Sequence, residues 1–421
     1  MNADWTYMNV EAATKSNKHL SKMTFFVGYG VLLLFRLSVL SLLAFPNGSI
    51  QNTLFHFGSL FILAVSSAIS VLWEKTPITK SCIPTLILFF VGVIQLILVK
   101  DALCIDLALV FFASRDIDFR EIAKFTLIVE GCGCAAIVLG SVIGLIPNYY
   151  NTRSDGTVRY YLGFTYSTLL SHLFLNMVLL VLYLRRERIS YYVIVLLAFI
   201  DTSIFVLTNS RNSFVLGLAA LLAAVILKRG VAGRFRCFGR CMQCCACIAV
   251  VLFPVISLLA ALLYNPQNDA WKSANLVLSN RLAQTSASVD RYGWTLFGQD
   301  IEFVGNGLVP GGDGLTDAAA HPDGDANFID NSYVHVLVIN GVLVAMATWM
   351  ALIISAQQCF RNNDSWMAVI LLVVALHSLF DPQLLQLVYN TFLFVIWRSI
   401  GSKCNSSMWK LPHHEISSGS A

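Results

Sequence analysis

Four arginines stand at the edges of apolar stretches or in polar segments, where their side chains could bind phosphate groups. Arg159 precedes an apolar stretch, Arg211 lies in a short polar turn between two others, and Arg281 and Arg291 belong to a longer polar segment. Arginine is always charged and can bind phosphate oxygens through two parallel hydrogen bonds. The alternative is that these side chains reach toward lipid headgroups or pair with acidic residues.

Candidate proton acceptors lie just before a long apolar run. Asp330 and His335 could each take a proton from a sugar hydroxyl as a general base. Asp330 could also be an N-cap, because an aspartate before a helix accepts hydrogen bonds from the amides of the first turn. His335 could be a helix-packing residue, and His321 is a weaker candidate than either.

Two further groupings could suggest a metal ion. Five cysteines lie between Cys237 and Cys247, but their spacing matches no usual set of zinc ligands and no histidine is near. The stretch Asp323–Asp325 lacks the ligand order of a calcium loop. We therefore expect no metal site, and we expect the cysteines to be ordinary thiols at a helix start.

These side chains are set in a chain with the composition of a membrane protein. Of its 421 residues, 57% are hydrophobic and 12% are charged, whereas an average soluble domain has roughly 25% charged residues. The mean hydropathy is +0.70. Long apolar runs recur from Phe25 to Trp397, and they must be helices because hydrocarbon offers no partner for backbone polar groups. This composition excludes a multi-domain soluble protein.

We expect an all-α polytopic membrane protein with about 12 transmembrane helices and a large extracytoplasmic loop between spans 9 and 10. The fourth span is short for a crossing of roughly 20 residues and could be tilted, buried or partly re-entrant. The expected spans are residues 24–45, 53–73, 82–99, 102–114, 125–146, 164–184, 190–208, 213–227, 246–264, 333–356, 366–380 and 384–398.

The charge distribution predicts the orientation of the chain. Segments expected in the cytoplasm hold 20 Lys and Arg residues and external segments hold 7, which places both termini in the cytoplasm. No cleavable signal peptide is evident, so the first apolar run is expected to be a retained signal anchor. The expected parts are a cytoplasmic arm at 1–23, spans 1–9 at 24–264, the loop at 265–332, spans 10–12 at 333–399 and a cytoplasmic tail at 400–421.

The loop at 265–332 is more than a linker. It has no cysteine, so its fold does not depend on disulfides. The helical spacing from Asn275 to Phe297 predicts one amphipathic helix on the membrane surface, followed by an irregular stretch rich in Gly and Asp. Loops of this length are usually functional or disordered.

Ionisable residues inside the spans are costly to bury and are functional candidates by default. Arg36 paired with Glu130 or Asp201 would instead be a structural pair. His172 could face a cavity that opens outward. The residues in this class are Arg36, Asp106, Glu130, His172, Asp201 and His377, with Asp381 at a span end.

Several short motifs, in their order and on one membrane face, resemble the Wzy-type polysaccharide polymerases of the O-antigen ligase superfamily. They include an arginine turn before span eight and flank a large external loop before span ten. The resemblance covers roughly residues 159–341, less than half of the chain. The matching pieces are Leu162-Gly163-Phe164, Asn209-Ser210-Arg211, Val304-Gly305-Asn306-Gly307 and Asp330-Asn331-Ser332-Tyr333 with Gly341.

The resemblance implies a membrane glycosyltransferase with a GT-C-like fold. Such enzymes transfer a growing glycan from undecaprenyl diphosphate to a sugar hydroxyl of a second lipid-linked repeat unit, at the outer face of the bacterial cytoplasmic membrane. They need no nucleotide sugar, no other cofactor and no metal. The implied partners are the lipid-linked donor and acceptor, the bilayer, a flippase and a chain-length regulator, with no nucleic acid among them.

The resemblance also implies three roles for the candidate residues. One group would hold the donor diphosphate and stabilise it as a leaving group. A second would activate the acceptor hydroxyl, and a third would contact the substrate. The residues are Arg211, Arg159, Arg291 and Arg281 for the diphosphate, Asp330 and His335 for the proton, and Tyr333, Asn331, His172 and Tyr166 for the substrate.

Two other functions stay open. An O-antigen-type ligase would transfer the finished glycan to a different acceptor. Asp330-Asn331 stands where ligases often have His-Asn, which favours the polymerase, and Tyr166 begins a Tyr-Ser-Thr stretch where many relatives have His-Pro-Asn. A flippase for lipid-linked oligosaccharides would be expected to show repeated halves, and the sequence has no internal repeat.

Overall fold

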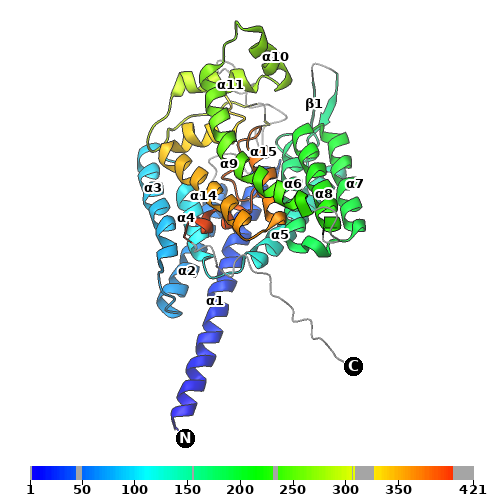
Figure 1. Cartoon of the computed structure of the whole chain (residues 1–421). Coiled ribbons are helices and arrows are strands. Elements are labelled where there is room, and N and C mark those ends of the chain that lie inside the picture. Colours follow the sequence, from blue (N-terminus) through cyan, green and yellow to red (C-terminus); the bar gives the residue numbers. More distant parts are fainter. Residues whose placement is uncertain are drawn as a thin grey trace.

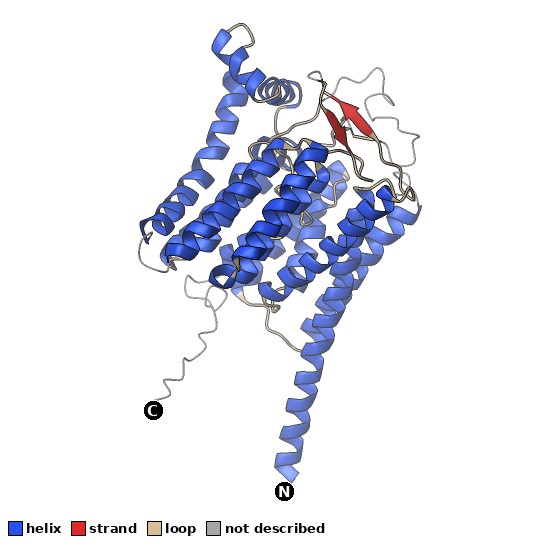
Figure 2. Ribbon diagram, turned by 90° about the vertical axis from the view of Figure 1, so that its right-hand side faces the viewer, coloured by secondary structure: helices blue, strands red, loops and turns tan. Residues whose placement is uncertain are grey.

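The computed structural model describes residues 2–43, 50–153, 156–230, 236–305, 307–308 and 327–401. Within these residues the chain is a bundle of helices with one short β-hairpin. We call the end of the bundle where α10, α11 and the hairpin gather the hairpin end, and the opposite end, where α1 begins, the N-terminal end (Figure 1). Figure 2 shows the two strands at the hairpin end from a second side.

The helices follow one another along the chain, joined mostly by short turns. Several begin at a side-chain cap: Asp118 accepts from the Arg120 N–H, and Ser190 accepts from the Val193 N–H. The elements are α1 (Asn2–Val39), α2 (Ile50–Ala68), η1 (Ile69–Trp73), η2 (Lys80–Cys82), α3 (Ile83–Val99), α4 (Leu103–Ala113), α5 (Phe119–Val142), β1 (Tyr150–Thr152), β2 (Val158–Tyr160), α6 (Leu169–Arg185), η3 (Arg186–Arg188), α7 (Tyr191–Thr208), α8 (Arg211–Gly230), α9 (Arg236–Leu263), α10 (Asp269–Val277), α11 (Arg281–Tyr292), α13 (Ser332–His335), η4 (Val336–Asn340), α14 (Gly341–Arg361), α15 (Ser365–His377) and α16 (Leu393–Gly401).

Nine of the described helices are long and apolar enough to cross a membrane, as judged by length and composition. This agrees with the expected helical, polytopic architecture. Each expected span from 53–73 to 246–264 coincides with one helix, and α4, in the place of the fourth, is short as expected. α1 is one continuous helix from Asn2, so it includes the segment expected as a separate arm at 1–23.

α6 lies at the centre of the bundle and α7 at its edge. In the most apolar stretch of α6, 67% of the residues are buried inside the protein, whereas the figure for α7 is 17%. Large apolar side chains of α7 such as Val195, Phe199 and Val206 are exposed. An apolar surface of this kind fits a helix that faces lipid, whereas α6 contributes polar side chains to the interior.

The last expected span, 384–398, is not one helix. α15 ends at His377, residues 378–392 are non-helical, and helix resumes only at α16. Pro382 explains the break in part, because proline lacks an N–H and disfavours helix at the residue before it. Most of the segment is buried, and its carbonyls accept hydrogen bonds from neighbouring side chains. Non-helical backbone at membrane depth is tolerated where protein surrounds it.

A second interruption lies in the span expected at 333–356. α13, η4 and α14 follow one another directly, but Gly341 has a φ of +84°, which favours glycine. The chain that follows α11 fits into this break, where the Val342 N–H donates to the Thr295 carbonyl at 3.0 Å. A Cβ atom on Gly341 would lie 2.3 Å from the Gly298 nitrogen, so only glycine fits without a shift of the backbone.

The loop before α13 contains two helices, α10 and α11, where we expected one. Ser279 and Asn280 both have positive φ, which ends the first helix and turns the chain into the second. Asn275 stabilises this turn, because its Oδ1 accepts from the Ala283 N–H at 3.0 Å and its Nδ2 donates to Asn280 Oδ1 at 3.1 Å. The expected Gly- and Asp-rich stretch, with His321 and Asp323–Asp325, falls mainly on residues 309–326, outside the described part of the chain.

Arg36, His56 and Asp106, which we call the Asp106 cluster, join α1, α2 and α4. Arg36 Nη2 lies 3.1 Å and His56 Nε2 lies 2.7 Å from Asp106 Oδ2. The expectation that Arg36 pairs with Glu130 or Asp201 is therefore wrong. The cluster ties three helices together through one buried carboxylate.

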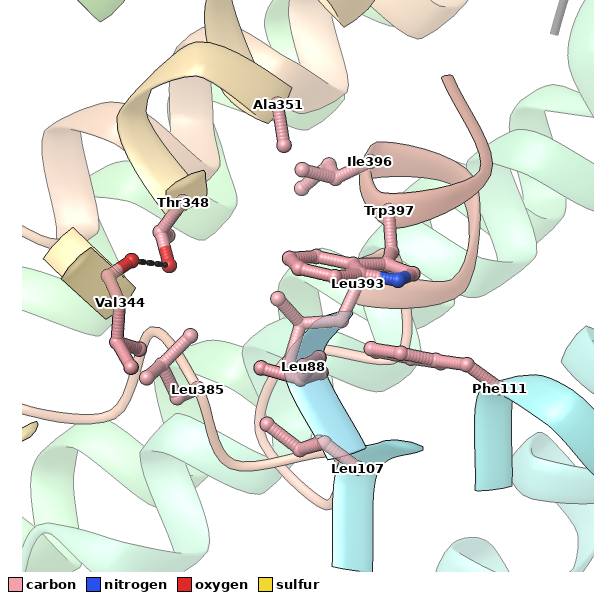
Figure 3. A pocket seen from close by; sticks show the side chains of 10 residues that line it. All are labelled: Leu88, Leu107, Phe111, Val344, Thr348, Ala351, Leu385, Leu393, Ile396 and Trp397. Atoms are coloured by element: carbon pink, nitrogen blue, oxygen red, sulfur yellow. Dashed lines mark hydrogen bonds between the residues drawn. The ribbon is translucent and has the colours of Figure 1, made fainter. Parts of the chain in front are cut away.

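An apolar pocket lies between α3, α4, α14 and α16 (Figure 3). Its polar lining groups are the Thr348 hydroxyl, which donates to the Val344 carbonyl at 2.7 Å, and the Trp397 indole N–H, which donates to the Thr85 hydroxyl at 3.1 Å. None of its lining side chains is titratable, so the pocket offers no group for acid–base chemistry.

Candidate functional site

Two histidines and an aspartate meet beside the non-helical segment 378–392, and we call them the Asp381 cluster. His172 lies in α6, His377 ends α15, and Asp381 follows four residues later. His172 Nε2 is 3.3 Å from Asp381 Oδ1, and His377 Nε2 is 3.4 Å from Asp381 Oδ2. The two imidazole rings are nearly perpendicular, with centroids 5.1 Å apart. The cluster is a polar centre inside the bundle, because His172 and Asp381 are buried.

The segment that carries Asp381 is held by two other elements. The Ser332 hydroxyl at the start of α13 donates to the Asp381 carbonyl and accepts from the Leu384 N–H. Asn331 donates from Nδ2 to the Leu379 carbonyl at 3.1 Å. On the carboxylate itself, Asn212 Nδ2 at the start of α8 donates to Oδ2 at 2.7 Å. The backbone and side chain of Asp381 are thus fixed from two sides.

Asp330 and Arg281 form an ion pair next to the start of α13. Arg281 Nε donates to Asp330 Oδ2 at 3.2 Å. The N-cap of α13 is Asn331, whose Oδ1 accepts from the backbone amides of residues 333 and 334, so the interpretation of Asp330 as the cap is wrong. Burial raises the pKa of the Asp330 carboxyl to about 6; the charge of Asp381 raises this pKa further and Arg281 opposes the rise. Asp330 is therefore half-buried, ionised at neutral pH and free of a capping role.

Arg159 is buried although it is charged. β2 carries it against the end of α7, where its Nε donates to the Thr208 carbonyl at 2.9 Å. Its guanidinium lies 5.7 Å from the centre of the Tyr166 ring. Its Nη2 has no hydrogen-bond partner among the described residues. A buried charge without a partner of opposite charge is costly, so an anionic ligand would complete this site.

Arg211 is the first residue of α8 and is exposed, with its Nε 3.3 Å from Asn209 Oδ1. The turn before α8 links the two groups described above: Thr208 receives the Arg159 hydrogen bond, and Asn212 reaches the Asp381 cluster. The start of a helix attracts anions, because its first N–H groups have no partner within the helix.

The other predicted residues lie farther from this centre or within helix packing. Arg291 is exposed at the end of α11, with its guanidinium 5.3 Å from the centre of the Tyr292 ring. Tyr333 is buried, and its hydroxyl donates to the Ala375 carbonyl at 2.9 Å. The His335 ring is stacked on Phe303 at a centroid distance of 5.6 Å. None of these contacts tests the roles predicted for Arg291, Tyr333 and His335, which stay predictions.

The structure brings together residues that the sequence treated separately. His377 and Asp381 were recognised as ionisable groups in or near spans, but only His172 was predicted to be a site residue. Asn212 gave no signal, because an asparagine after a turn has many ordinary roles. The ionisable residues near a span end were the usable signal, and their partners were not visible in any local pattern.

The hairpin end thus holds a set of groups that could bind an anion and accept a proton. Comparisons with models of known protein families, with curated proteins and with solved structures find no match. What the site does must therefore be inferred from its own geometry and from the motifs of the sequence.

Proposed function

We propose that this protein is a polysaccharide polymerase that transfers a growing glycan from undecaprenyl diphosphate to a sugar hydroxyl of another lipid-linked repeat unit. The observation that carries the proposal is Arg159, a buried guanidinium whose Nη2 has no partner among the described residues. A diphosphate oxygen is a partner of the right charge and geometry. The neighbouring start of α8 adds further attraction for an anion.

In this proposal the hairpin end faces outward and both termini are cytoplasmic, in the cytoplasmic membrane of a bacterium. About twelve crossings result when α1 to α9, α13–α14, α15 and the segment 378–401 are each counted as one, which fits a GT-C-like arrangement. Arg115, Arg186, Lys228 and Arg240 lie toward the N-terminal end, as the bias of positive charge to the cytoplasm requires.

The proposed reaction breaks the bond between the donor sugar and the diphosphate and forms a glycosidic bond to the acceptor oxygen. Arg159 and Arg211 stabilise the negative charge that the leaving diphosphate gains. Asp330 takes the proton of the acceptor hydroxyl, because it is ionised at neutral pH and close to Arg281. Undecaprenyl diphosphate leaves, and the lengthened glycan stays on the acceptor lipid.

The test is deletion of the protein, followed by analysis of the lipid-linked glycans that accumulate. Single repeat units on the outer side of the membrane are the expected result. Long polymer on the lipid carrier would instead identify an O-antigen-type ligase. Repeat units that remain on the inner side would identify a flippase, and an unchanged glycan profile would exclude all three.

One structural observation favours a flippase as the second candidate. The breaks at Gly341 and at 378–392 are interruptions of membrane-crossing segments, and transporters bind their substrates at such breaks. A purified protein in vesicles distinguishes the two functions. Movement of a labelled lipid-linked repeat unit across the bilayer without polymer formation would replace the polymerase with the flippase.

A further inference from the structure

The Asp381 cluster has the composition of a metal site. One ligand atom from each of His172, His377 and Asp381 lies within 4.8 Å of the others. Two imidazoles and a carboxylate are a ligand set that catalytic zinc sites use, and similar divalent ions accept it too. Two of the three residues are buried, and the three come from α6, the end of α15 and the segment after it.

The two His–Asp contacts of the cluster are longer than most hydrogen bonds, and they run to different oxygens of the Asp381 carboxylate. N–H···O bonds have lengths of about 2.7–3.2 Å, whereas the two His–Asp distances are 3.3 and 3.4 Å. His377 Nε2 has no hydrogen-bond partner among the described residues. Around a tetrahedral ion with bonds of about 2.0–2.1 Å, the centroids of two imidazole ligands lie about 5 Å apart. The observed centroid separation is 5.1 Å.

The Asp106 cluster gives an internal reference. There a hydrogen-bonded histidine and aspartate lie 2.7 Å apart, and Arg36 pairs with the same carboxylate oxygen at 3.1 Å. No arginine or lysine forms an ion pair with Asp381 among the described residues, and Arg281 is paired with Asp330. Arg281 is near enough to act electrostatically on both histidines, but within the described residues the Asp381 carboxylate has no direct arginine partner of the kind that Asp106 has.

The surroundings also fit a preformed site. Asn212 holds the carboxylate through Oδ2, and Ser332 holds the backbone of Asp381. His172 Nδ1 and Gln383 Oε1 are both buried without a hydrogen-bond partner among the described residues. Gln383 lies close enough to His172 for a side-chain hydrogen bond, which would orient the imidazole ring.

We propose that His172, His377 and Asp381 bind one divalent transition-metal ion of the zinc class. The ion joins α6 and α15 to the non-helical segment 378–392 and leaves at least one coordination position open. This inference does not depend on the proposed function, because bound metal is measured directly. It departs from the metal independence that the sequence resemblance implies.

The test uses the full-length protein, purified in detergent with a tag that contains no histidine. Elemental analysis should find an equimolar amount of a divalent transition metal, and Co²⁺ added to metal-free protein should give the intense visible absorption of a four-coordinate site. His172→Ala, His377→Ala and Asp381→Asn should each weaken binding by at least about tenfold. His56→Ala is the matched control, since it removes a histidine paired with a buried aspartate, and it should bind metal as the wild type does.

Two results would overturn the proposal. Wild-type protein that neither carries metal nor binds added Zn²⁺ or Co²⁺ would reduce the cluster to a hydrogen-bonded group. The same follows if His172→Ala and His377→Ala bind Co²⁺ with wild-type affinity and spectrum. Because the wild-type titration stands alone, the proposal stays testable even if a variant fails to fold.

Discussion

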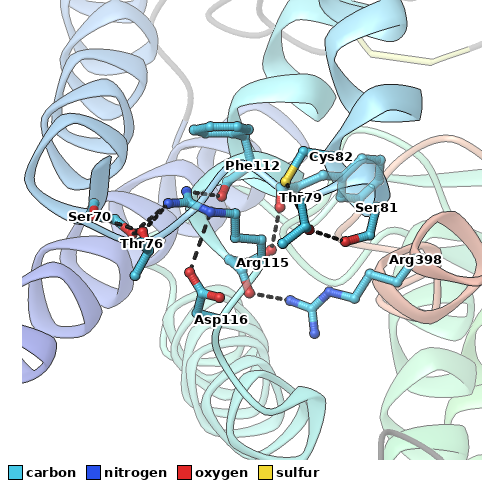
Figure 4. A network of polar contacts seen from close by, with 11 residues as sticks. Ser70, Thr76, Thr79, Ser81, Cys82, Phe112, Arg115, Asp116 and Arg398 are labelled. Carbon is cyan, nitrogen blue, oxygen red and sulfur yellow. Dashed lines mark hydrogen bonds and ion pairs between the residues drawn. The ribbon is translucent and has the colours of Figure 1, made fainter. Parts of the chain in front are cut away.

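Arginines at the two ends of the bundle differ in the partners that their guanidinium groups have. At the N-terminal end Arg115 donates from Nη2 to Ser70 at 2.7 Å and Thr76 at 2.6 Å, and from Nη1 to the Phe112 carbonyl at 3.0 Å (Figure 4). Arg186 forms a two-pronged pair with Asp364, at 3.1 and 3.0 Å. At the hairpin end the buried Arg159 bonds one backbone carbonyl through Nε, and its Nη2 has no partner among the described residues.

This difference separates structural cations from one that is available to a ligand. Arg115 and Arg186 anchor turns and helix ends, and the partners of their Nη atoms are part of the fold. Charges at the membrane boundary that are paired in this way need no functional explanation. Arg159 is more deeply buried than either and, unlike them, has no acidic partner among the described residues, so its unpaired Nη2 points to an anionic ligand. The two kinds of arginine should respond differently to mutation.

Arg159→Ala should have the largest effect on activity. Removal of one group that stabilises developing negative charge typically lowers a rate by on the order of 100-fold or more. The measurement is polymer formed from lipid-linked repeat units, normalised to the amount of folded protein. Arg159→Lys should lose nearly as much activity. The planar guanidinium can donate to the Thr208 carbonyl and to the ligand at the same time, and a lysine ammonium cannot reproduce this geometry. Wild-type polymer from Arg159→Ala would remove Arg159 from the mechanism.

Arg186→Ala should act on stability instead. It leaves Asp364 buried without its partner, and breaking a buried pair in this way costs about 3–5 kcal/mol. Asp364 also caps α15 through the Met367 N–H, so that helix should loosen. The measurement is the thermal unfolding midpoint in detergent, with activity per folded molecule expected to stay near wild type. Replacing Asp364 as well should recover part of the lost stability. If the double variant lost as much stability as the two single variants added together, the pairing of Arg186 with Asp364 would be contradicted.

The activity should depend on pH through Asp330. Since burial holds the pKa of this carboxyl at about 6, above its usual value, the group loses its charge as the pH falls through 6. A general base works only when it is ionised, so the rate should fall about tenfold per pH unit below 6 and level off above it. Arg281→Ala should move the inflection to higher pH, because Arg281 lowers this pKa. An inflection that stays in place would assign the titration to another group.

The sequence predicted the helical architecture and singled out several residues of the candidate site, but it did not show which residues they contact. Apolar runs and the arginine turn before α8 are local patterns, and the structure places most helices where they were expected. The break at 378–392 was missed because the segment remains apolar enough to be taken for a helix. Asp330 was interpreted as a cap because aspartate is a common N-cap residue. The actual N-cap is the next residue, Asn331, and asparagine has the same preference for this position, so the sequence alone could not distinguish them. The contact between His172 and Asp381 depends on the packing of α6 against the segment 378–392, which is far away in the sequence, so no local pattern predicts it.

Arg211→Ala tests the same distinction on the smallest scale. Arg211 lies close in sequence to Thr208, which Arg159 bonds, but it is exposed, and water already screens its charge. We therefore expect a loss of activity of about tenfold, well below that of Arg159→Ala, and near-complete rescue by Arg211→Lys because an exposed site needs mainly the charge. The measurement is the chain-length distribution of the lipid-linked glycan at equal protein levels. If Arg211→Ala were as severe as Arg159→Ala, burial would not be what distinguishes the two arginines, and the diphosphate would be held mainly at the start of α8.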